Sequence, residues 1–140
     1  MSLLKDFLLE NADVGTKEVE IAVSKRFVDK DGNLLKFKIR PMSGDEFGRY
    51  QKACTSIKMM GRKKETSFDS GKFNVMCIVN HCVDPDFKEA AFLKSLNVQT
   101  PEQAVDKVLL AGEVVELGNR ISEISGFDTD INEEIEEAKN

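Results

Sequence analysis

Five apolar side chains near the end of the chain recur at alternating spacings of four and three residues. This pattern constrains the fold more than any other feature of the sequence. The five residues are Leu110, Val114, Leu117, Ile121 and Ile124. The spacing places them on one narrow seam of an α-helix, of the kind that packs against another helix. Acidic and polar residues occupy the other faces, and the run stops at Gly126, a natural residue to end a helix. The sequence therefore predicts binding through an apolar seam rather than catalysis.

Length and charge bound the class of protein. A chain of 140 residues is typical of one domain. The net charge of −5 argues against a general nucleic-acid binder, which is usually basic. No apolar run reaches the roughly 18 residues that a helix needs to span a bilayer, so we expect no membrane segment. The start of the chain does not resemble a signal peptide, and its 3 cysteines favour free thiols in a reducing cytoplasm.

The first 40 residues predict a short helix and then a β-hairpin. Residues 2–10 have the spacing of an amphipathic helix that Ser2 can cap. Alternating apolar and charged residues at 17–28 and 35–40 flank a turn signal at 29–33, which predicts an antiparallel hairpin ending at Pro41. An isolated two-stranded ribbon would be only marginally stable, so we expect helices to cover its apolar face.

The middle of the chain predicts three helices and an exposed loop. Ser43 and Glu46 form a capping box at the start of the first helix. That helix frays into a basic segment, 58–64, which we interpret as a solvated loop. Residues 71–83 are apolar nearly all round, which predicts a central buried helix capped by Asp69 or Ser70, although their β-branched residues leave a strand as an alternative. A shorter helix is expected at 86–96.

The last third predicts a strongly marked helix and an acidic end. Thr100, Pro101 and Gln103 combine a cap, a proline at the first helical position and a reciprocal capping residue. Gly112 suggests a kink or break before the seam. The predicted fold class is mainly α (α+β): one compact helical domain, residues 1–127, with a small N-terminal antiparallel β-hairpin at about 17–40. Residues 128–140 are expected to form an acidic tail or a weak helix.

Sites for metal ions or catalysis are weakly supported. Cys77 and His81 are four residues apart and share a helix face, but a zinc site usually needs four ligands. Cys82 is adjacent to the single histidine, yet neighbours on a helix point about 100° apart. We therefore interpret these residues as parts of a buried helix. We predict no catalytic, cofactor-binding or metal residues and no enzymatic activity.

The order and spacing of several segments resemble a known family. The segments are FKIRPMSGDEFGRYQKAC (37–54), NHCVDPDF (80–87) and SLNVQTPEQAVDKVLLAGEVVELGNRISEISGFD (95–128). Together they are similar to the XkdN-like tail assembly chaperones of long-tailed phages and phage-like bacterial elements. The last segment is the most specific, with its proline-capped helix, the LLAGE junction and the closing ISEISGF. The similarity covers nearly the whole chain.

This resemblance implies a non-enzymatic role in the cytoplasm of the bacterial host. Such proteins coat the long helical tape-measure protein, keep it soluble and help the tail tube to polymerise around it, and they are absent from the finished virion. The implied partners are the tape-measure protein and the tail-tube protein. In many phages the gene is also read through by a frameshift. Because Ala138–Asn140 can be encoded by a slippery heptamer, we hypothesise that this chain is the short, unshifted product.

The partner-binding residues predicted from the sequence are six apolar side chains. They are Leu110, Val114, Leu117 and Ile121 on the seam, with Met59 and Met60 as a second, flexible patch. An apolar seam of this kind could also close a homodimer, so the oligomeric state stays open. The alternative function is a structural tail or head–tail connector subunit that remains in the particle. No nucleic-acid or membrane partner is expected.

Overall fold

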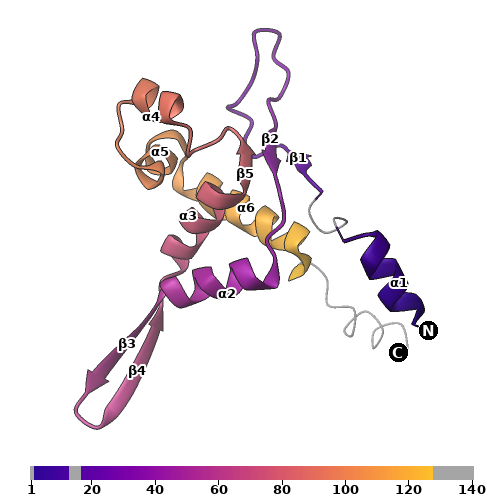
Figure 1. Ribbon diagram of the computed structural model, residues 1–140. Helices are drawn as coiled ribbons and strands as arrows, with labels where there is room; N and C mark the ends of the chain where they lie inside the picture. The colour runs from indigo at the N-terminus through magenta and orange to yellow at the C-terminus, as the bar shows by residue number, and fades with distance from the viewer. Residues whose placement is uncertain (1, 13–16, 128–140) are drawn as a thin grey trace, which may run out of the picture.

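The computed structural model describes residues 2–12 and 17–127 of the chain. Within these residues the first elements are α1 (Leu3–Glu10), β1 (Val19–Ile21), β2 (Phe37–Ile39), α2 (Gly44–Ala53), β3 (Thr55–Met60) and β4 (Lys63–Phe68). They are followed by α3 (Ser70–His81), β5 (Cys82–Asp84), α4 (Ala90–Leu96), α5 (Pro101–Val108), α6 (Ala111–Ser122) and a π-helical turn, η2 (Glu123–Phe127). Figure 1 shows α2, α3, α5 and α6 gathered beside a small sheet. The hairpin β3–β4 projects away from them.

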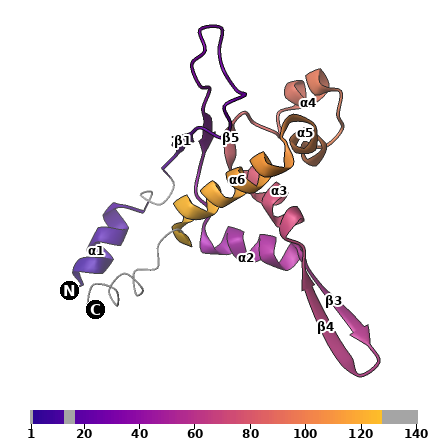
Figure 2. The same ribbon diagram turned by 180° about the vertical axis from the view of Figure 1, so that it is seen from behind.

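The small sheet is antiparallel and joins distant parts of the chain. Its strand order is β1-β2-β5, so β2 is the central strand. Ile39 of β2 pairs with Val19 on one side and with Cys82 on the other. The chain between β1 and β2 extends away from the helices as a long loop (Figure 2). A single isolated bridge, between Val28 and Leu34, closes its tip among the described residues.

The core lies between this sheet and helices α3, α5 and α6. Its fully buried apolar side chains are Ile39, Cys77, Ile78, Phe87, Ala104, Val105, Leu117 and Ile121. Helices α3 and α6 approach closely at Gly118, where an added Cβ would come within 2.5 Å of the Asn74 Oδ1 atom. A side chain at this position would therefore force the Asn74 side chain to move.

Several local predictions are confirmed. Ser2 caps α1, and Asp69 caps α3. Capping boxes are formed by Ser43 with Glu46 and by Thr100 with Gln103. The predicted interruption near Gly112 is a complete break, because α5 ends at Val108 and α6 begins at Ala111.

The predicted fold class, with one small N-terminal hairpin, is wrong. The described strands are scattered from residue 19 to residue 84 and belong to two sheets, and β1 and β2 are only part of one of them. The predicted helix at 71–83 ends at His81, and the next three residues complete the first sheet as β5. The predicted loop at 58–64 belongs to a hairpin of two six-residue strands. The predicted acidic tail or weak helix, 128–140, lies outside the described residues.

The hairpin was missed because its composition suggests a loop. Four of its residues are basic, and its apolar residues are few. Its strands nevertheless pair in register from Thr55 opposite Phe68 to Met60 opposite Lys63. Gly61 makes the tight turn possible, because its φ of +66° is one that other residues rarely adopt.

Candidate partner-binding surfaces

Most of the predicted seam closes the protein's own core. Leu117 and Ile121 are fully buried, and Val114 is half-buried against the core. Leu110 occupies the N-cap position of α6 and is 62% exposed. A partner could reach Leu117 and Ile121 only if α6 left its place against α3. Of the four seam residues that were predicted to bind a partner, Leu110 is therefore the one that is exposed in this conformation. Binding through the seam stays a prediction.

The two methionines of the second predicted patch lie on opposite faces of a β-ribbon. Met59 is opposite Lys64 and Met60 is opposite Lys63. Successive side chains of a strand point to opposite faces, so the two thioethers do not form one continuous patch. Both are exposed, at 64% and 61%. The structure thus offers each methionine to solvent, and partner contact by either one stays a prediction.

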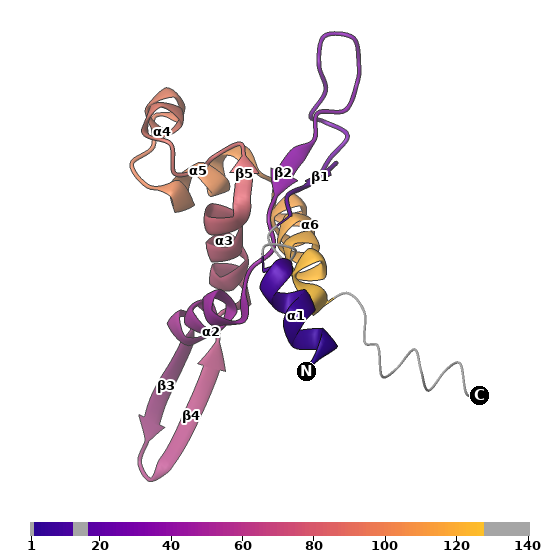
Figure 3. The ribbon, with the colours of Figure 1, turned by 45° about the vertical axis from the view of Figure 1, so that its right-hand side comes forward.

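One face of the β3–β4 hairpin is apolar. The pairing places Ile57, Met59 and Phe68 on this face, and all three are at least half exposed. An open hollow lies where this face meets α2, lined by Gly48, Gln51, Lys52, Thr55 and Ile57. Figure 3 shows the hairpin clear of the rest of the chain. Because a lone two-stranded ribbon gains little stability in water, the exposed face is a candidate contact surface.

A row of four aromatic rings continues from the base of the hairpin. Phe68 packs against Phe73 of α3 at 5.5 Å between ring centroids. Phe73 meets Phe47 of α2 at 5.7 Å, and Phe47 meets Phe127 at 4.9 Å. The two end rings of this aromatic row are exposed, and the two middle rings are half-buried. Sequence spacing placed Phe47 and Phe73 on separate helices, but it could not show that four elements bring their rings into one row.

Helix α1 presents the most exposed apolar face. Leu3, Leu4, Phe7 and Leu8 share one side of the helix, yet every residue of α1 is exposed. Leu3 is 89% exposed. Figures 1 and 2 show α1 standing apart from α2–α6. The sequence predicted the amphipathic helix, but not that its apolar side would be left open.

A buried carboxylate ties the β1–β2 loop to the α5–α6 junction. Both Glu113 carboxylate oxygens accept hydrogen bonds of 2.7 Å from the Arg26 guanidinium. Glu113 also accepts the Leu110 backbone N–H at 2.8 Å, and Arg26 donates to the Val108 carbonyl. Hydrogen bonding from Arg26 lowers the pKa of Glu113 to about 2. This contact explains the glutamate of the LLAGE junction, for which the sequence had suggested no role.

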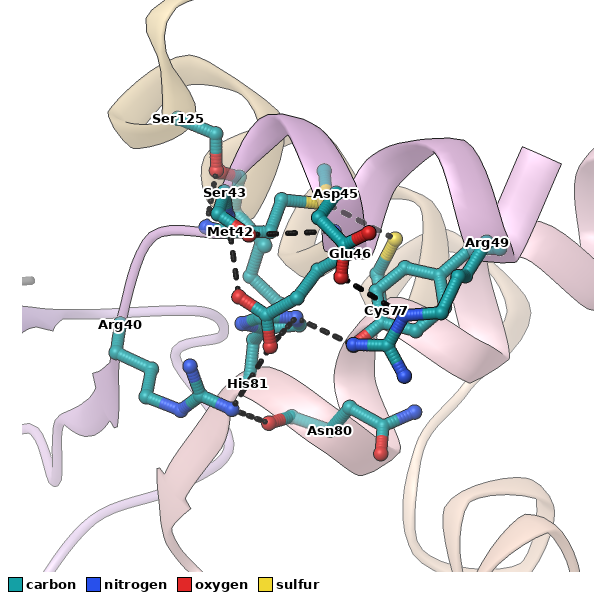
Figure 4. A network of polar contacts seen from close by, with 12 residues as sticks. Arg40, Met42, Ser43, Asp45, Glu46, Arg49, Cys77, Asn80, His81 and Ser125 are labelled. Atoms are coloured by element: carbon teal, nitrogen blue, oxygen red, sulfur yellow. Dashed lines mark hydrogen bonds and ion pairs between the residues drawn. The ribbon is translucent and has the colours of Figure 1, made fainter.

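The single histidine belongs to a buried network rather than to an open site. Its Nε2 atom lies 2.9 Å from the Tyr50 hydroxyl. Arg40 lies beside it, donating to the Asn80 carbonyl at 2.8 Å and contacting Glu46 at 3.5 Å (Figure 4). Burial lowers the pKa of His81 to about 4, so the ring is neutral at physiological pH. The network joins β2, α2 and α3.

The cysteines are poorly suited to nucleophilic chemistry. Cys54, Cys77 and Cys82 are free and buried. Burial raises the pKa of Cys77 and of Cys82 to about 12, so both are thiols at neutral pH. Among residues 2–12 and 17–127, no three histidine, cysteine or acidic side chains gather in a way that could hold a metal ion. In the same residues, no helix has the length and hydropathy to cross a membrane.

Known proteins are similar to this chain over nearly its full length. Residues 4–139 match the family described as phage XkdN-like tail assembly chaperone protein. The phage-like element PBSX protein XkdN of Bacillus subtilis strain 168 is 29% identical over 136 residues, 96% of this chain and 92% of XkdN. The uncharacterized protein YqbN of the same strain is 32% identical over 136 residues, 96% of this chain and 91% of YqbN. A crystal structure of YqbN superposes with a TM-score of 0.64 at 31% identity, covering 81% of this chain and 87% of that chain.

Proposed function

This chain belongs to the family of phage XkdN-like tail assembly chaperones, and from that membership we propose that it binds the tape-measure protein, keeps it soluble and promotes assembly of the tail tube. The family assignment confirms the resemblance noted in the sequence. The proposed site of action is the cytoplasm of the bacterial host, and we expect the protein to be absent from the mature virion. The tail-tube protein is a proposed second partner.

The observation that carries this proposal is the open apolar face of α1. Isolated helices shorter than about 12–15 residues are marginal in water, and α1 has 8 residues with none buried. Such a helix gains most of its stability from the surface on which its apolar side packs. A tape-measure protein without its tube is expected to expose apolar helical surface, which aggregates unless it is covered.

Capture of one amphipathic helix by another is the proposed mechanism. Leu3, Leu4, Phe7 and Leu8 would pack against the apolar stripe of the partner, as in other cases where a helix occupies a groove. The remaining charged surface, with a net charge of −5 for the chain, would keep the complex in solution. Exposed Leu110, Met59 and Met60 are proposed secondary contacts. Leu117 and Ile121 are not needed for this mechanism.

The test is co-expression with the tape-measure protein of the same phage element. We expect the tape-measure protein to be insoluble alone and to be recovered in a soluble complex when this chain is present. Leu4→Asp with Phe7→Asp should abolish that complex, because two charges would lie in the apolar contact. The matched control is Lys5→Asp with Glu10→Lys, which changes charged residues of the same helix and should leave the complex intact.

Each outcome decides between explanations. A tape-measure protein that stays insoluble with the wild-type chain would refute the chaperone proposal. If this chain then formed rings and was found in purified particles, the connector alternative would replace it. A soluble complex that survives the double aspartate variant would show that α1 is not the binding surface. Circular dichroism and thermal unfolding should show that the variant remains folded, because α1 contributes no buried residue.

A further inference from the structure

The β3–β4 hairpin is a basic element on an acidic protein. Its basic residues are Lys58, Arg62, Lys63 and Lys64, and its single acidic residue is Glu65. None of the four basic side chains forms an ion pair with a carboxylate of residues 2–12 or 17–127. Lys64 lies on the exposed apolar face formed by Ile57, Met59 and Phe68, whereas Lys58 and Lys63 lie on the opposite face of the hairpin.

The end of the sequence has the complementary composition. Residues 128–140 contain six acidic residues and one basic residue, Lys139. They also contain Ile131 and Ile135, two apolar residues four apart. A segment of this kind can offer isoleucines to the apolar face of the hairpin and carboxylates to Lys64 on the same face.

The aromatic row connects the start of this segment to the hairpin. Phe127 immediately precedes residue 128 and lies at one end of the row, and Phe68 of β4 lies at the other. The three steps between neighbouring ring centroids measure 4.9, 5.7 and 5.5 Å. An extended chain spans about 3.3 Å per residue, so thirteen residues reach roughly 40 Å. That length suffices to follow the row and continue along the hairpin.

We propose that residues 128–140 dock on the apolar face of the β3–β4 hairpin of the same chain, the face that also carries Lys64. Pairing with the hairpin of a second copy is disfavoured, because both hairpins would carry the same excess of positive charge. Nucleic acid is disfavoured by the net charge of −5 for the whole chain. The proposal concerns contacts within this chain and does not rest on tape-measure binding.

Paramagnetic relaxation in the full chain tests the contact. A nitroxide is attached to a cysteine introduced by Ala138→Cys, while buried Cys54, Cys77 and Cys82 remain largely unlabelled. We expect the methyl signals of Met59 and Met60 to lose intensity and to recover when the nitroxide is reduced. High salt should also restore them, because the attraction between exposed charges is screened.

Charge-reversed variants provide the matched control. Lys58→Glu, Lys63→Glu and Lys64→Glu together should abolish the loss of methyl intensity. Lys25→Glu, Lys30→Glu and Lys36→Glu make the same charge change on the exposed β1–β2 loop and should leave it unchanged. Equal intensity loss in both triple variants, or none in the unaltered chain, would overturn the proposal. A mixed sample of nitroxide-labelled chains and unlabelled chains provides a second check. If the methionine methyl signals of the unlabelled chains lost intensity, the contact would join two copies, and the proposal would be overturned.

Discussion

Helices α1 and α6 have similar apolar spacing and opposite environments. In α6, Leu117 and Ile121 are completely buried, whereas in α1 Leu3 is 89% exposed. The spacing of apolar residues therefore indicates that a helix has a face to cover, but not whether the same chain covers it. The apolar face of α6 packs against the protein's own core. No described residue of the chain buries the apolar face of α1.

The difference lies in how each helix is attached. Glu113 ties the start of α6 to the β1–β2 loop, and Ser125, just after it, accepts the Met42 backbone N–H at 2.9 Å. Gly118 allows α6 to approach α3 closely in between. Within residues 2–12 and 17–127, helix α1 is held only by local caps, from Ser2 at its start and Asn11 at its end. The following predictions test whether this contrast in attachment is also a contrast in stability.

The largest expected effect separates the two apolar faces directly. Leu117→Ala should lower the free energy of unfolding by about 2–5 kcal/mol, because it leaves a cavity in the core. Leu4→Ala on α1 should change it by less than about 0.5 kcal/mol, since Leu4 is exposed. Urea unfolding followed by circular dichroism measures both. A comparable loss in the two variants would mean that α1 packs on the domain in solution.

A pair of glycines in α6 should respond in opposite directions. Gly118→Ala should cost about 1–3 kcal/mol, because the new methyl group meets Asn74 of α3. Gly112→Ala meets nothing within 4 Å and should stabilise the helix by up to about 1 kcal/mol. Thermal unfolding compares them. Stabilisation by both substitutions would show that α3 and α6 are not closely packed at Gly118.

Acid should weaken the core through His81. Its pKa is lowered by burial from 6.5 to about 4, so the folded state resists protonation that the unfolded state accepts. The stability of the protein is therefore intact above pH 6.5 and falls as the pH is lowered toward 4, by at most about 1.4 kcal/mol per pH unit. His81→Gln can keep a hydrogen bond to Tyr50 without this titration, and should flatten the dependence. An unchanged slope in urea unfolding from pH 7 to 4 would assign the effect to another group.

The smallest effect concerns the attachment of the β1–β2 loop. Glu113→Gln should cost less than about 1 kcal/mol at neutral pH, because the Arg26 side chain is 43% exposed and the ion pair is screened. The lowered pKa of Glu113 means that its contribution is present above pH 4.5 and is lost as the pH falls toward 2. The variant should lack that loss, while Glu116→Gln should retain it. Identical acid unfolding of Glu113→Gln and the wild type would contradict the role of this ion pair.

Features with local chemical causes were predictable from the sequence. The capping boxes at Ser43 and Thr100 and the cap at Asp69 depend on side chains within three residues of the groups they satisfy. The strand β5 was missed because Cys82 and Val83 continue the apolar run of α3, and only pairing with β2 distinguishes this strand from the helix. Pairing between distant segments leaves no local signal in so short a strand.

The candidate surfaces were predictable only in part. The sequence indicated that α1 has an apolar side, and it suggested Met59 and Met60 as residues that could contact a partner; both methionines are exposed. The aromatic row could not, because it is assembled from β4, α3, α2 and η2. The burial of Leu117 and Ile121 also required the structure, since a seam that closes a core and one that receives a partner have the same spacing.

The shortness of α1 has a kinetic consequence for the proposed chaperone. A helix that becomes ordered only when it binds spends part of its interaction free energy on that ordering, so its complex has a shorter residence time than a preformed helix with the same contacts would give. With 8 residues, α1 is therefore expected to release its proposed partner faster than a preformed helix with the same contacts would. A longer, more stable α1 would bind more tightly and slow that release.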